Sequence, residues 1–506
     1  MSENEEFYDS SHIREQRIDL IEKMRAQGLE PYASNFDRTH NNLQARERYE
    51  FCEEYQFVTA GGNAQGVKTD PMRLAGRVVR YRAQGKLGFA DIVDESGKIQ
   101  IMARLNVLGA DGMALYKQID LGDFIGVEGT VVKSSSGEIS VDVEHLQILT
   151  KAIRPLPDSF YGLKDPETRA RQRHLDMIMN PEVVSTLKRR SQIISSIRRY
   201  LETKEFIEVE TPVLQSVAGG AAARPFLTHH NALGQNLQLR IALELYLKRL
   251  IIGGIEKVFE IGRVFRNEGI SSRHNPEFTL LELYQAYGDL EDMKKLTESM
   301  IRKLAIQLNG TASLNYQDQE ISLEGVWNSV EMLELISRKF PALEIDDLPA
   351  LQNKAAELGA IQPEILTWGT AVIEIFERAV EPTLVQPTFV TGYPVEVSPL
   401  ARRRDGDDRL AERFELYIAG MEIANAFSEL TDPVEQRLRF EQQIQMQQAG
   451  GTESHPMDTA FIEAMESGMP PTGGLGIGID RLVALLTNSS TIKDVIAFPL
   501  LRALPD

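Results

Sequence analysis

The sequence has little cysteine and no long apolar run. Its 506 residues include a single cysteine, Cys52, which excludes an intrachain disulfide and a zinc site built from several thiolates. No stretch approaches the ~18 consecutive apolar residues of a transmembrane helix, and residues 1–7 have neither the basic nor the apolar part of a secretion signal. We therefore expect a cytoplasmic protein with no membrane partner.

Basic residues are also few relative to acidic ones. The chain has 55 Lys and Arg against 74 Asp and Glu, a net charge of −19, which argues against a surface that binds nucleic acid everywhere. Any contact with nucleic acid must then be local. At roughly 150 residues per domain, the length predicts about three domains.

A β-rich segment follows a polar, helical beginning. Residues 1–68 are predicted to form a helical arm, and residues 69–152 a separate domain with a helix at 111–119. Its strands are expected at residues 72–82, 86–94, 98–106, 123–134 and 138–150. Five strands with a helix between the third and the fourth are typical of an OB-fold barrel, a common platform for single-stranded nucleic acid.

The first half of this predicted barrel is basic within an acidic protein. Ile99, Ile101 and Ala103 share one strand face by the period of two, which turns Gln100 outward, beside Phe89 of the preceding strand. An exposed ring beside an amide suits base stacking with reading of a base edge. The alternative is that Phe89 belongs to the barrel core and that the basic residues form an ordinary solvated surface.

The rest of the chain is predicted to be a linker and a larger mixed domain. Residues 153–182 contain four prolines among charged residues, which is typical of a linker. Residues 183–506 mix helices and strands, with a helical insert at about 289–380. The fold class expected is α+β.

Two runs, 257–268 and 277–288, predict an antiparallel hairpin with a long polar loop. On a period of two, Arg266 and Glu268 share one face of the first strand. On the second strand, one face carries Phe278, Leu280, Glu282 and Tyr284, and the loop adds Arg273 and His274. Such a charged face is either open to water or built to hold a charged ligand.

Residues 413–429 predict a second acidic hairpin. A tight turn at Ala419-Gly420 sets Glu422 opposite Tyr417 and leaves Glu415 on the same face, so that the two carboxylates could share Mg²⁺. Three further polar or aromatic residues have the opposite parity, namely Asn425, Phe427 and Glu429. All five can face one cavity only if a β-bulge lies near Ile423-Ala424.

A glycine-rich strand, residues 473–478, leads into a helix at 481–486. Its glycine spacing does not fit the dinucleotide pattern G-x-G-x-x-G. Close backbone packing, with one exposed Arg481 at the start of the helix, fits better.

Together these elements resemble the signature motifs of the class II aminoacyl-tRNA synthetases over most of the chain. The carrying segments are Arg266–Gly269, Arg273–Phe278 and Gly476–Arg481, together with the helix and strand at 183–212. A class II catalytic domain of this kind is an antiparallel sheet flanked by helices. An OB module placed before the core resembles the subgroup for lysine, aspartate and asparagine.

The acidic pocket residues are similar to those of the lysyl-tRNA synthetases of bacterial type. Carboxylates suit the ammonium of lysine, whereas they would repel aspartate and would stay unpaired beside asparagine. By this resemblance Gly220 and Glu244 bind the α-amino end, and Glu282, Tyr284 and Glu429 the ε-ammonium. Asn425 and Phe427 complete the pocket.

The resemblance also implies the other roles. Arg266 and Arg481 are expected to be catalytic and to bind ATP, and Glu415 and Glu422 to bind Mg²⁺. Further ATP contacts are expected from Glu268, Arg273, His274, Phe278 and Glu415, and anticodon contacts from Arg77, Phe89, Gln100 and Glu138. Besides ATP, the partners implied are L-lysine, tRNA(Lys) and a second copy of the chain, with no DNA. A protein ligase for lysine would typically lack the OB module.

Two alternatives remain open at this point. One is an aspartyl- or asparaginyl-tRNA synthetase, against which the pocket acids argue. The other is a catalytically silent relative that binds tRNA and regulates, which would be expected to have lost Arg266, Arg481, Glu415 or Glu422.

Overall fold

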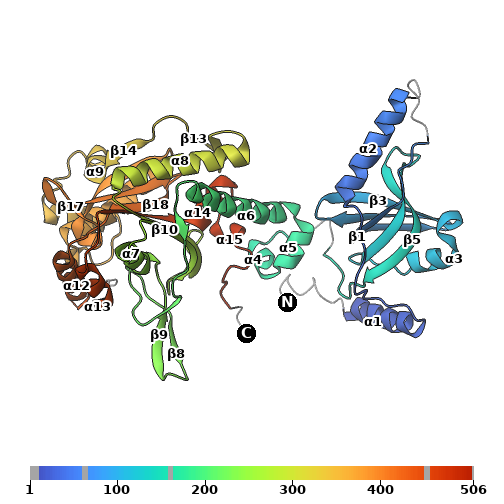
Figure 1. The fold of residues 1–506 in the computed structure, drawn as a ribbon, viewed down its shortest axis with the longest axis horizontal. Helices are drawn as coiled ribbons and strands as arrows, with labels where there is room; N and C mark the ends of the chain where they lie inside the picture. Colours follow the sequence, from blue (N-terminus) through green and yellow to red (C-terminus); the bar gives the residue numbers. More distant parts are fainter. Residues whose placement is uncertain (1–10, 60–65, 158–162, 449–455, 504–506) are drawn as a thin grey trace. The chain divides into compact units, whose positions relative to one another are not determined.

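The structure, a computed structural model, describes residues 11–59, 66–157, 163–448 and 456–503. Two compact units divide the chain at Lys164/Asp165 (Figure 1). Parts of the predicted arm and linker, at 1–10, 60–65 and 158–162, lie outside the described residues.

The first unit is a closed β-barrel with three helices. Its elements are α1 (Ser11–Ala26), α2 (Asn42–Thr59), β1 (Met72–Gln84), β2 (Leu87–Asp94), β3 (Gly97–Arg104), α3 (Leu105–Tyr116), β4 (Phe124–Lys133) and β5 (Ile139–Thr150). The strands close in the order β1-β2-β3-β5-β4, with β3 and β5 parallel. This confirms the predicted OB-fold, including the helix between the third and the fourth strand.

The barrel core follows the predicted parity. Ile99, Ile101 and Ala103 are fully buried, whereas Gln100 and Phe89 are half-buried on the outer face. The helix after β3 begins earlier than the predicted residue 111, because it follows the strand directly and continues past a non-helical Gly109 with φ 78°. Phe89 is therefore not a core residue.

The second unit is built on one large sheet with helices on both faces. Its helices are α4 (Pro166–Arg171), α5 (Arg173–Met179), α6 (Pro181–Glu202), α7 (Glu244–Ile252), α8 (Leu290–Asn309), α9 (Met332–Lys339), α10 (Leu348–Glu357), α11 (Trp368–Ile375), α12 (Pro433–Gln448), α13 (Thr459–Glu466), α14 (Ile479–Leu486) and α15 (Ile492–Val495). The α+β prediction is confirmed.

The large sheet runs in the order β14-β15-β17-β18-β19-β11-β10-β6, with β16 beside β17. Its strands are β6 (Ile207–Glu208), β10 (Lys257–Phe265), β11 (Glu277–Ala286), β14 (Asn328–Glu331), β15 (Thr388–Pro394), β16 (Arg403–Arg404), β17 (Asp407–Ile418), β18 (Met421–Ser428) and β19 (Thr472–Gly478). Smaller sheets are formed by β12 (Ser313–Tyr316) with β13 (Gln319–Ser322), and by β7 (Leu214–Gln215), β9 (Gln235–Leu239) and β8 (Leu227–His230). The central strands pair antiparallel.

Residue parity sorts the two faces of the sheet. Leu281 and Leu283 of β11 join the main apolar core with residues of α6, α8 and α14. The opposite parity, with Glu282 and Tyr284, faces the side where α7 packs. One face thus carries the main core, and the other carries smaller apolar clusters and the residues that line a cavity.

Two predicted regions differ from the structure. The segment expected as a linker, 153–182, includes α4, α5 and the start of α6, which lie in the second unit, because Asp165 caps α4 and Arg173 is buried in an ion pair with Asp176. The segment expected as a helical insert, 289–380, also holds the strands β12, β13 and β14. Its first helix, α8, packs against β18 and β19 and belongs to the main core.

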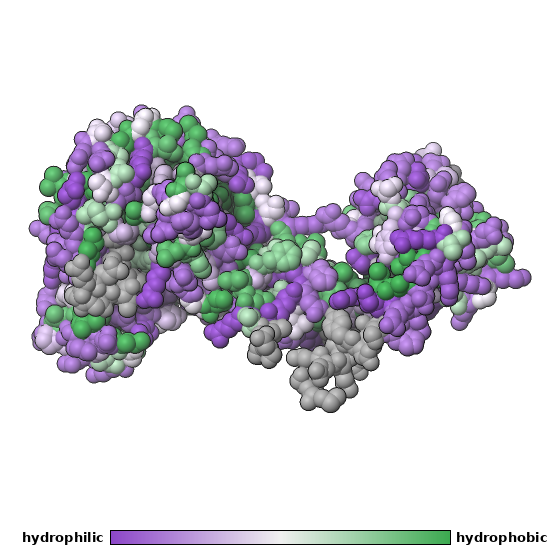
Figure 2. All heavy atoms as spheres, turned by 90° about the horizontal axis from the view of Figure 1, so that it is seen from below, coloured by the Kyte–Doolittle hydropathy of each residue, from purple (hydrophilic) through white to green (hydrophobic). Residues whose placement is uncertain are grey.

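Surface composition is mixed on the face drawn in Figure 2, where apolar patches are small and interrupted by hydrophilic side chains. Among the described residues, no helix has the length and apolarity needed to span a bilayer.

Candidate active site

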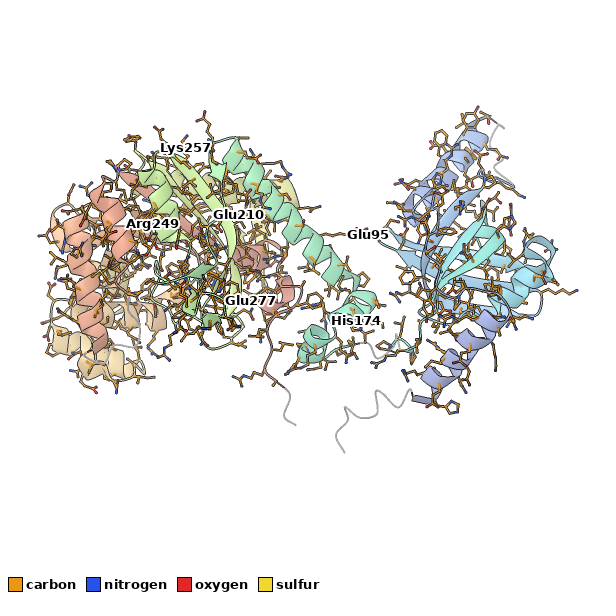
Figure 3. The ribbon with its side chains drawn as sticks, turned by 60° about the horizontal axis from the view of Figure 1, so that its bottom comes forward. Glu95, His174, Glu210, Arg249, Lys257 and Glu277 are labelled. Carbon is orange, nitrogen blue, oxygen red and sulfur yellow. The ribbon has the colours of Figure 1, made fainter. Side chains whose placement is uncertain are left out.

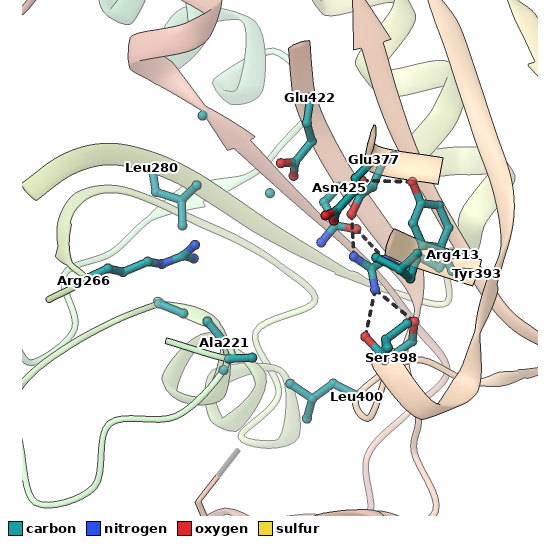
Figure 4. A pocket seen from close by; sticks show the side chains of 18 of the residues that line it. Ala221, Arg266, Leu280, Glu377, Tyr393, Ser398, Leu400, Arg413, Glu422 and Asn425 are labelled. Atoms are coloured by element: carbon teal, nitrogen blue, oxygen red, sulfur yellow. Dashed lines mark hydrogen bonds and ion pairs between the residues drawn. The ribbon is translucent and has the colours of Figure 1, made fainter. Parts of the chain in front are cut away.

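A cavity of about 1060 Å³ opens on the free face of the large sheet. Its walls come from the β10–β11 hairpin, from β17 and β18, and from the glycine strand β19. Figure 4 shows Arg266 and Leu280 on one side, facing Glu422, Asn425 and Arg413 on the other. Every ATP, metal and lysine residue predicted from the sequence lines this cavity.

The first hairpin forms as predicted, although its first strand is shorter. β10 and β11 pair antiparallel from Lys257↔Gln285 to Phe265↔Glu277, so Lys257 and Glu277 mark its two ends in Figure 3. Arg266 and Glu268 were expected within the strand but lie just after it, because the Arg266 N–H turns to bond the Pro276 carbonyl. The two residues still line the cavity, so the predicted site is kept by the loop.

Arginines and aromatic rings gather at the hairpin end. The Arg266 guanidinium lies 5.1 Å from the centre of the Phe278 ring, and its Nε donates to the Ile241 carbonyl. Burial lowers the pKa of Arg266, yet an arginine remains charged at neutral pH. A cation beside a ring, in an open cavity, suits a nucleotide with its phosphates.

Arg481 lies at the start of α14 and reaches across the sheet. It donates to the Glu422 carboxylate at 2.9 Å and to His274 Nε2 at 3.2 Å. Because a guanidinium can only donate, His274 accepts at Nε2, and its Nδ1–H donates to Ser271 Oγ. Burial, and then the charge of Arg481, lower the pKa of His274, so the imidazole is neutral at pH 7.

An ion pair of the residue before Arg481 fixes the start of helix α14. This residue, Asp480, accepts from Arg190 and from the Thr279 N–H, at 2.5 and 2.7 Å. Helix α14 is thereby fixed to α6 and β11. Arg273, at the other side of the mouth, donates to the Gly420 carbonyl at 2.7 Å.

The second hairpin contains the predicted bulge. Tyr417 pairs with Glu422 and Leu416 with Ala424, so Ile423 is the extra residue. The turn before it has φ of 54° at Ala419 and 64° at Gly420, as a tight type I′ hairpin turn requires. The bulge brings Glu422 and the residues after Ala424 to one side, and this confirms the parity argument.

The two carboxylates predicted for Mg²⁺ lie in an acidic wall. Glu415 accepts from Arg413 at 2.5 Å and from the Tyr393 hydroxyl at 2.9 Å. Burial, together with the charge of Glu422, raises the pKa of Glu415. Burial, together with the charge of Glu415, also raises the pKa of Glu377, in the same wall, to about 7. A bound cation would stabilise the ionised form of these carboxylates.

The two carboxylates supply only part of the ligands that a magnesium ion needs. Within the described ranges, no group of three or more His, Cys, Asp or Glu residues could hold a metal ion. Mg²⁺ is usually bound by one or two carboxylates together with substrate phosphates. Glu415 and Glu422 therefore suit a magnesium ion that arrives with a nucleotide.

The far end of the cavity is a buried cluster of carboxylates. Glu244, Glu282 and Glu429 are each at most 5% exposed. Glu282 accepts from the Leu243 N–H at 3.0 Å and from the Tyr284 hydroxyl at 3.1 Å. Burial raises the pKa of Glu282 to about 7 and that of Glu429 to about 8. Three acids held this close need cationic partners.

Glycines make the room at this end. A Cβ on Gly474 would lie 2.0 Å from Glu429 Oε1 and 2.6 Å from the Tyr284 ring. A Cβ on Gly220, where φ is 88°, would lie 3.0 Å from that of Glu244. The glycine-rich strand thus packs tightly, as predicted, and it does so against the acidic pocket.

Two cations of the site were not singled out from the sequence. Arg413 donates to Asn425 Oδ1 at 3.1 Å and to Glu415, which ties the two hairpin strands together (Figure 4). Lys248 lies behind the pocket with its ammonium 2.5 Å from both Glu244 and Glu429. The signals were spacing: Arg413 stands two residues before Glu415 on a strand, and Lys248 four after Glu244 on a helix.

The predicted anticodon residues lie on the barrel of the first unit. Phe89 pairs with Met102 and Gln100 with Asp91 across β2 and β3, on the outer face. Gln100 accepts from Ser140 at 2.9 Å. The other two predicted residues already have partners: Arg77 donates to the Gly122 carbonyl and stacks on Phe124, and Glu138 pairs with Arg46.

Comparison with known proteins gives two family matches. Residues 165–502 match the family described as tRNA synthetases class II (D, K and N), and residues 72–149 match the OB-fold nucleic acid binding domain.

Similar full-length proteins carry one name. The chain is 48% identical to Lysine–tRNA ligase of Oceanobacillus iheyensis, covering 97% of this chain and 99% of the relative. It is 50% identical to Lysine–tRNA ligase of Pelotomaculum thermopropionicum, covering 98% and 96%. It is 47% identical to the Bacillus subtilis protein of that name, covering 99% and 98%.

Proposed function

The chain belongs to the class II tRNA synthetases for aspartate, lysine and asparagine, among the lysine–tRNA ligases, and we propose how its cavity activates L-lysine with ATP and charges tRNA(Lys). The observation that carries the choice of amino acid is the cluster of Glu244, Glu282 and Glu429, buried at one end of the cavity. Buried carboxylates favour an ammonium and repel an acidic side chain.

Lysine would lie along the β11–β19 side of the cavity. Glu282, Tyr284 and Glu429 would take the ε-ammonium, while Glu244 and the main chain at Gly220 take the α-amino group. Phe427 would line the aliphatic stem, beside Asn425. The carboxylate of lysine would then point to Arg266, at the other end.

ATP would bind between the rings and arginines of the hairpin end. Phe278 and Arg481 would sandwich the adenine, and Glu268 would accept from its amino group. Arg273 and His274, at the mouth, would lie near the γ-phosphate. Arg266 would hold the α-phosphate against the carboxylate of lysine.

Mg²⁺ would be held by Glu415 and Glu422, and when bound it neutralises charge on the phosphates. The reaction needs no protein nucleophile: the lysine carboxylate attacks the α-phosphorus, giving lysyl-adenylate and pyrophosphate. A terminal ribose hydroxyl of tRNA then takes the lysyl group. The residues of the chain position the reactants and stabilise charge as it develops.

The barrel would read the anticodon on the outer face of β2 and β3. Phe89 would stack on a base, and Gln100 would bond a base edge. Arg77 and Glu138 would have to exchange their present partners, Gly122 and Arg46, to contact RNA. Stacking contributes ~1–3 kcal/mol per base, so this face adds to the contacts of the catalytic unit rather than replacing them.

Two copies of the chain would associate through the region of α6 and β6. β6 is an edge strand of the large sheet, and Ile207, Val213 and Leu214 near it are exposed apolar residues. An apolar sheet edge is a natural place for a second copy. Sedimentation of the purified chain tests this, and a monomer at micromolar concentration would contradict it.

We place the activity in the cytoplasm, where charged tRNA is used.

The test of the function is pyrophosphate exchange with each amino acid, followed by charging of purified tRNAs. Lysine is expected to support exchange and tRNA(Lys) to be charged. Exchange with aspartate or asparagine, but not with lysine, would contradict the assignment of lysine as the substrate. No exchange with any amino acid would favour a silent tRNA-binding relative.

A further inference from the structure

Lys248 lies in the middle of α7, the helix marked in Figure 3 by its neighbour Arg249. Its side chain is 1% exposed, and its ammonium is 2.5 Å from Glu244 Oε1 and 2.5 Å from Glu429 Oε2. The two carboxylates come from different parts of the chain, the start of α7 and the end of β18. Lys248 is the group that joins them.

The pairing is incomplete on the acidic side. Three carboxylates, those of Glu244, Glu282 and Glu429, share one buried end of the cavity, and Lys248 supplies a single positive charge. Among the described residues, Glu429 Oε1 has no hydrogen-bond partner. When all three acids are ionised, the described side chains of this end carry two negative charges in excess, and the three acids line the cavity.

Two excess negative charges in the pocket match the two positive charges of lysine's ammonium groups. Lysine carries two ammonium groups, and its carboxylate has a separate partner in Arg266. Without Lys248, three buried like charges would repel one another, and at least one would take up a proton. A protonated acid binds an ammonium weakly, and the resident cation lowers the cost of ionising the acids when the substrate binds.

We propose that Lys248 is a positioning residue for lysine: it holds Glu244 and Glu429 as one ion-paired unit and sets the pocket charge to the two ammonium groups of the substrate. The inference rests on the proposed function. Lys248 lies behind the two carboxylates and does not contact lysine, so it acts through them.

The surroundings of Lys248 define what its loss would do. The titratable groups that face its ammonium are Glu244 on α7 and Glu429 after β18, with the Tyr284 ring of β11 5.8 Å away. Glu282 on β11 acts on Glu429 rather than on Lys248 directly. Burial works against the ammonium, but the two paired carboxylates outweigh it and raise the pKa of Lys248. In return, Lys248 lowers the pKa of Glu429, but burial outweighs this effect and the pKa still lies at about 8.

The variant to test is Lys248→Met, which keeps the length of the side chain and removes its charge. In pyrophosphate exchange without tRNA, we expect the KM for lysine to rise about 10- to 100-fold, while the KM for ATP stays within about twofold. Because Glu429 would titrate at higher pH, the pH at which the lysine KM begins to fall should move upward. Lys248→Gln, which keeps hydrogen-bond donors, should behave alike and covers a failure of the first variant to fold.

The first unit offers a matched control in Lys151. This lysine is also fully buried, with its ammonium 2.7 Å from Asp120 and 2.6 Å from Asp123. Lys151→Met removes an equal charge from a buried ion pair of the other unit. It is expected to lower thermal stability and to leave the KM for lysine unchanged.

The outcomes distinguish a failure of the proposed function from a failure of the role proposed for Lys248. If the wild type shows no lysine-dependent exchange, the proposed function fails before any variant is compared. If the wild type exchanges with lysine but the Lys248 variants keep its KM and pH profile, the inference is wrong. Equal losses for lysine and ATP, together with a lower melting temperature, would make Lys248 merely structural and would also overturn it.

Discussion

Two fully buried lysines, one in each unit, have similar partners and different surroundings. Lys151 of the barrel is bonded by Asp120, Asp123 and the Gln118 carbonyl, and Asp123 also accepts the Ala152 N–H. Lys248 pairs with two carboxylates, a third carboxylate lies near them, and Glu429 Oε1 has no hydrogen-bond partner among the described residues. A closed ion pair ties a fold together, whereas one with surplus acid is ready for a ligand.

Removing one acid from each cluster should give the largest difference between the two lysines. Glu429→Gln should reduce kcat/KM for lysine roughly 30-fold or more, which corresponds to a loss of ~2–5 kcal/mol of transition-state binding. Asp123→Asn should leave that value unchanged and instead lower the free energy of unfolding by about 3 kcal/mol, since it breaks a buried pair. Exchange kinetics and urea unfolding measure the two effects.

The contradicting result for this pair is a reversal. If Asp123→Asn weakened lysine use as much as Glu429→Gln, the two clusters would not differ in role. Unchanged kcat/KM for lysine in Glu429→Gln would show that Glu429 does not face the ammonium.

A second prediction separates the two units by reaction step. Phe89→Ala should reduce tRNA charging by ~1–3 kcal/mol, about 5- to 150-fold in kcat/KM for tRNA, because it removes a stacking surface. Lysyl-adenylate formation should be normal. Phe36→Ala is the control, since Phe36 is another half-buried ring of the barrel unit, packed beside Gly126 and Arg73. An equal loss in both reaction steps would contradict the split.

The smallest expected effect is a pH dependence of ligand binding. The pKa of Glu282 is raised to about 7, so the folded protein binds more protons than the unfolded chain between about pH 4.5 and 7, and its intrinsic stability falls as pH rises through that window. Lysine binding has the opposite sign, because it needs the ionised acid. The shift in melting temperature caused by saturating lysine should therefore be larger at pH 8 than at pH 6.

This shift is measured by thermal scans with and without lysine at constant ionic strength. Glu282→Gln should flatten the dependence. A lysine-induced shift equal at both pH values would argue that Glu282 remains ionised throughout.

Much of the fold followed from strand parity. The closed barrel, the β10–β11 hairpin and the bulge at Ile423 were all predictable, because a period of two assigns each side chain to a face and a mismatch demands an extra residue. Helix boundaries were less predictable. α3 begins at Leu105 rather than 111 because Gly109 allows the chain to continue through a kink.

The site was predictable where residues share an element and less so where partners come from distant segments. Glu415 and Glu422 stand on neighbouring strands, and local register alone places them together. Lys248 pairs with Glu429, which stands 181 positions further along the chain, and no local pattern encodes such a contact. In the same way, the helical content of 165–182 depends on Asp165 capping and on the Arg173 pair, which outweigh the linker-like prolines.

The bulge at Ile423 also makes the second hairpin modular. On the turn side of it, Glu422 is the carboxylate that we propose faces the phosphates, and on the other side residues 425–429 carry the proposed amino-acid pocket. Because the register is reset at a single residue, substitutions after Ala424 can change amino-acid preference without turning Glu422 away. A redesign of the pocket could therefore keep the nucleotide chemistry, whereas deleting Ile423 would invert one half against the other.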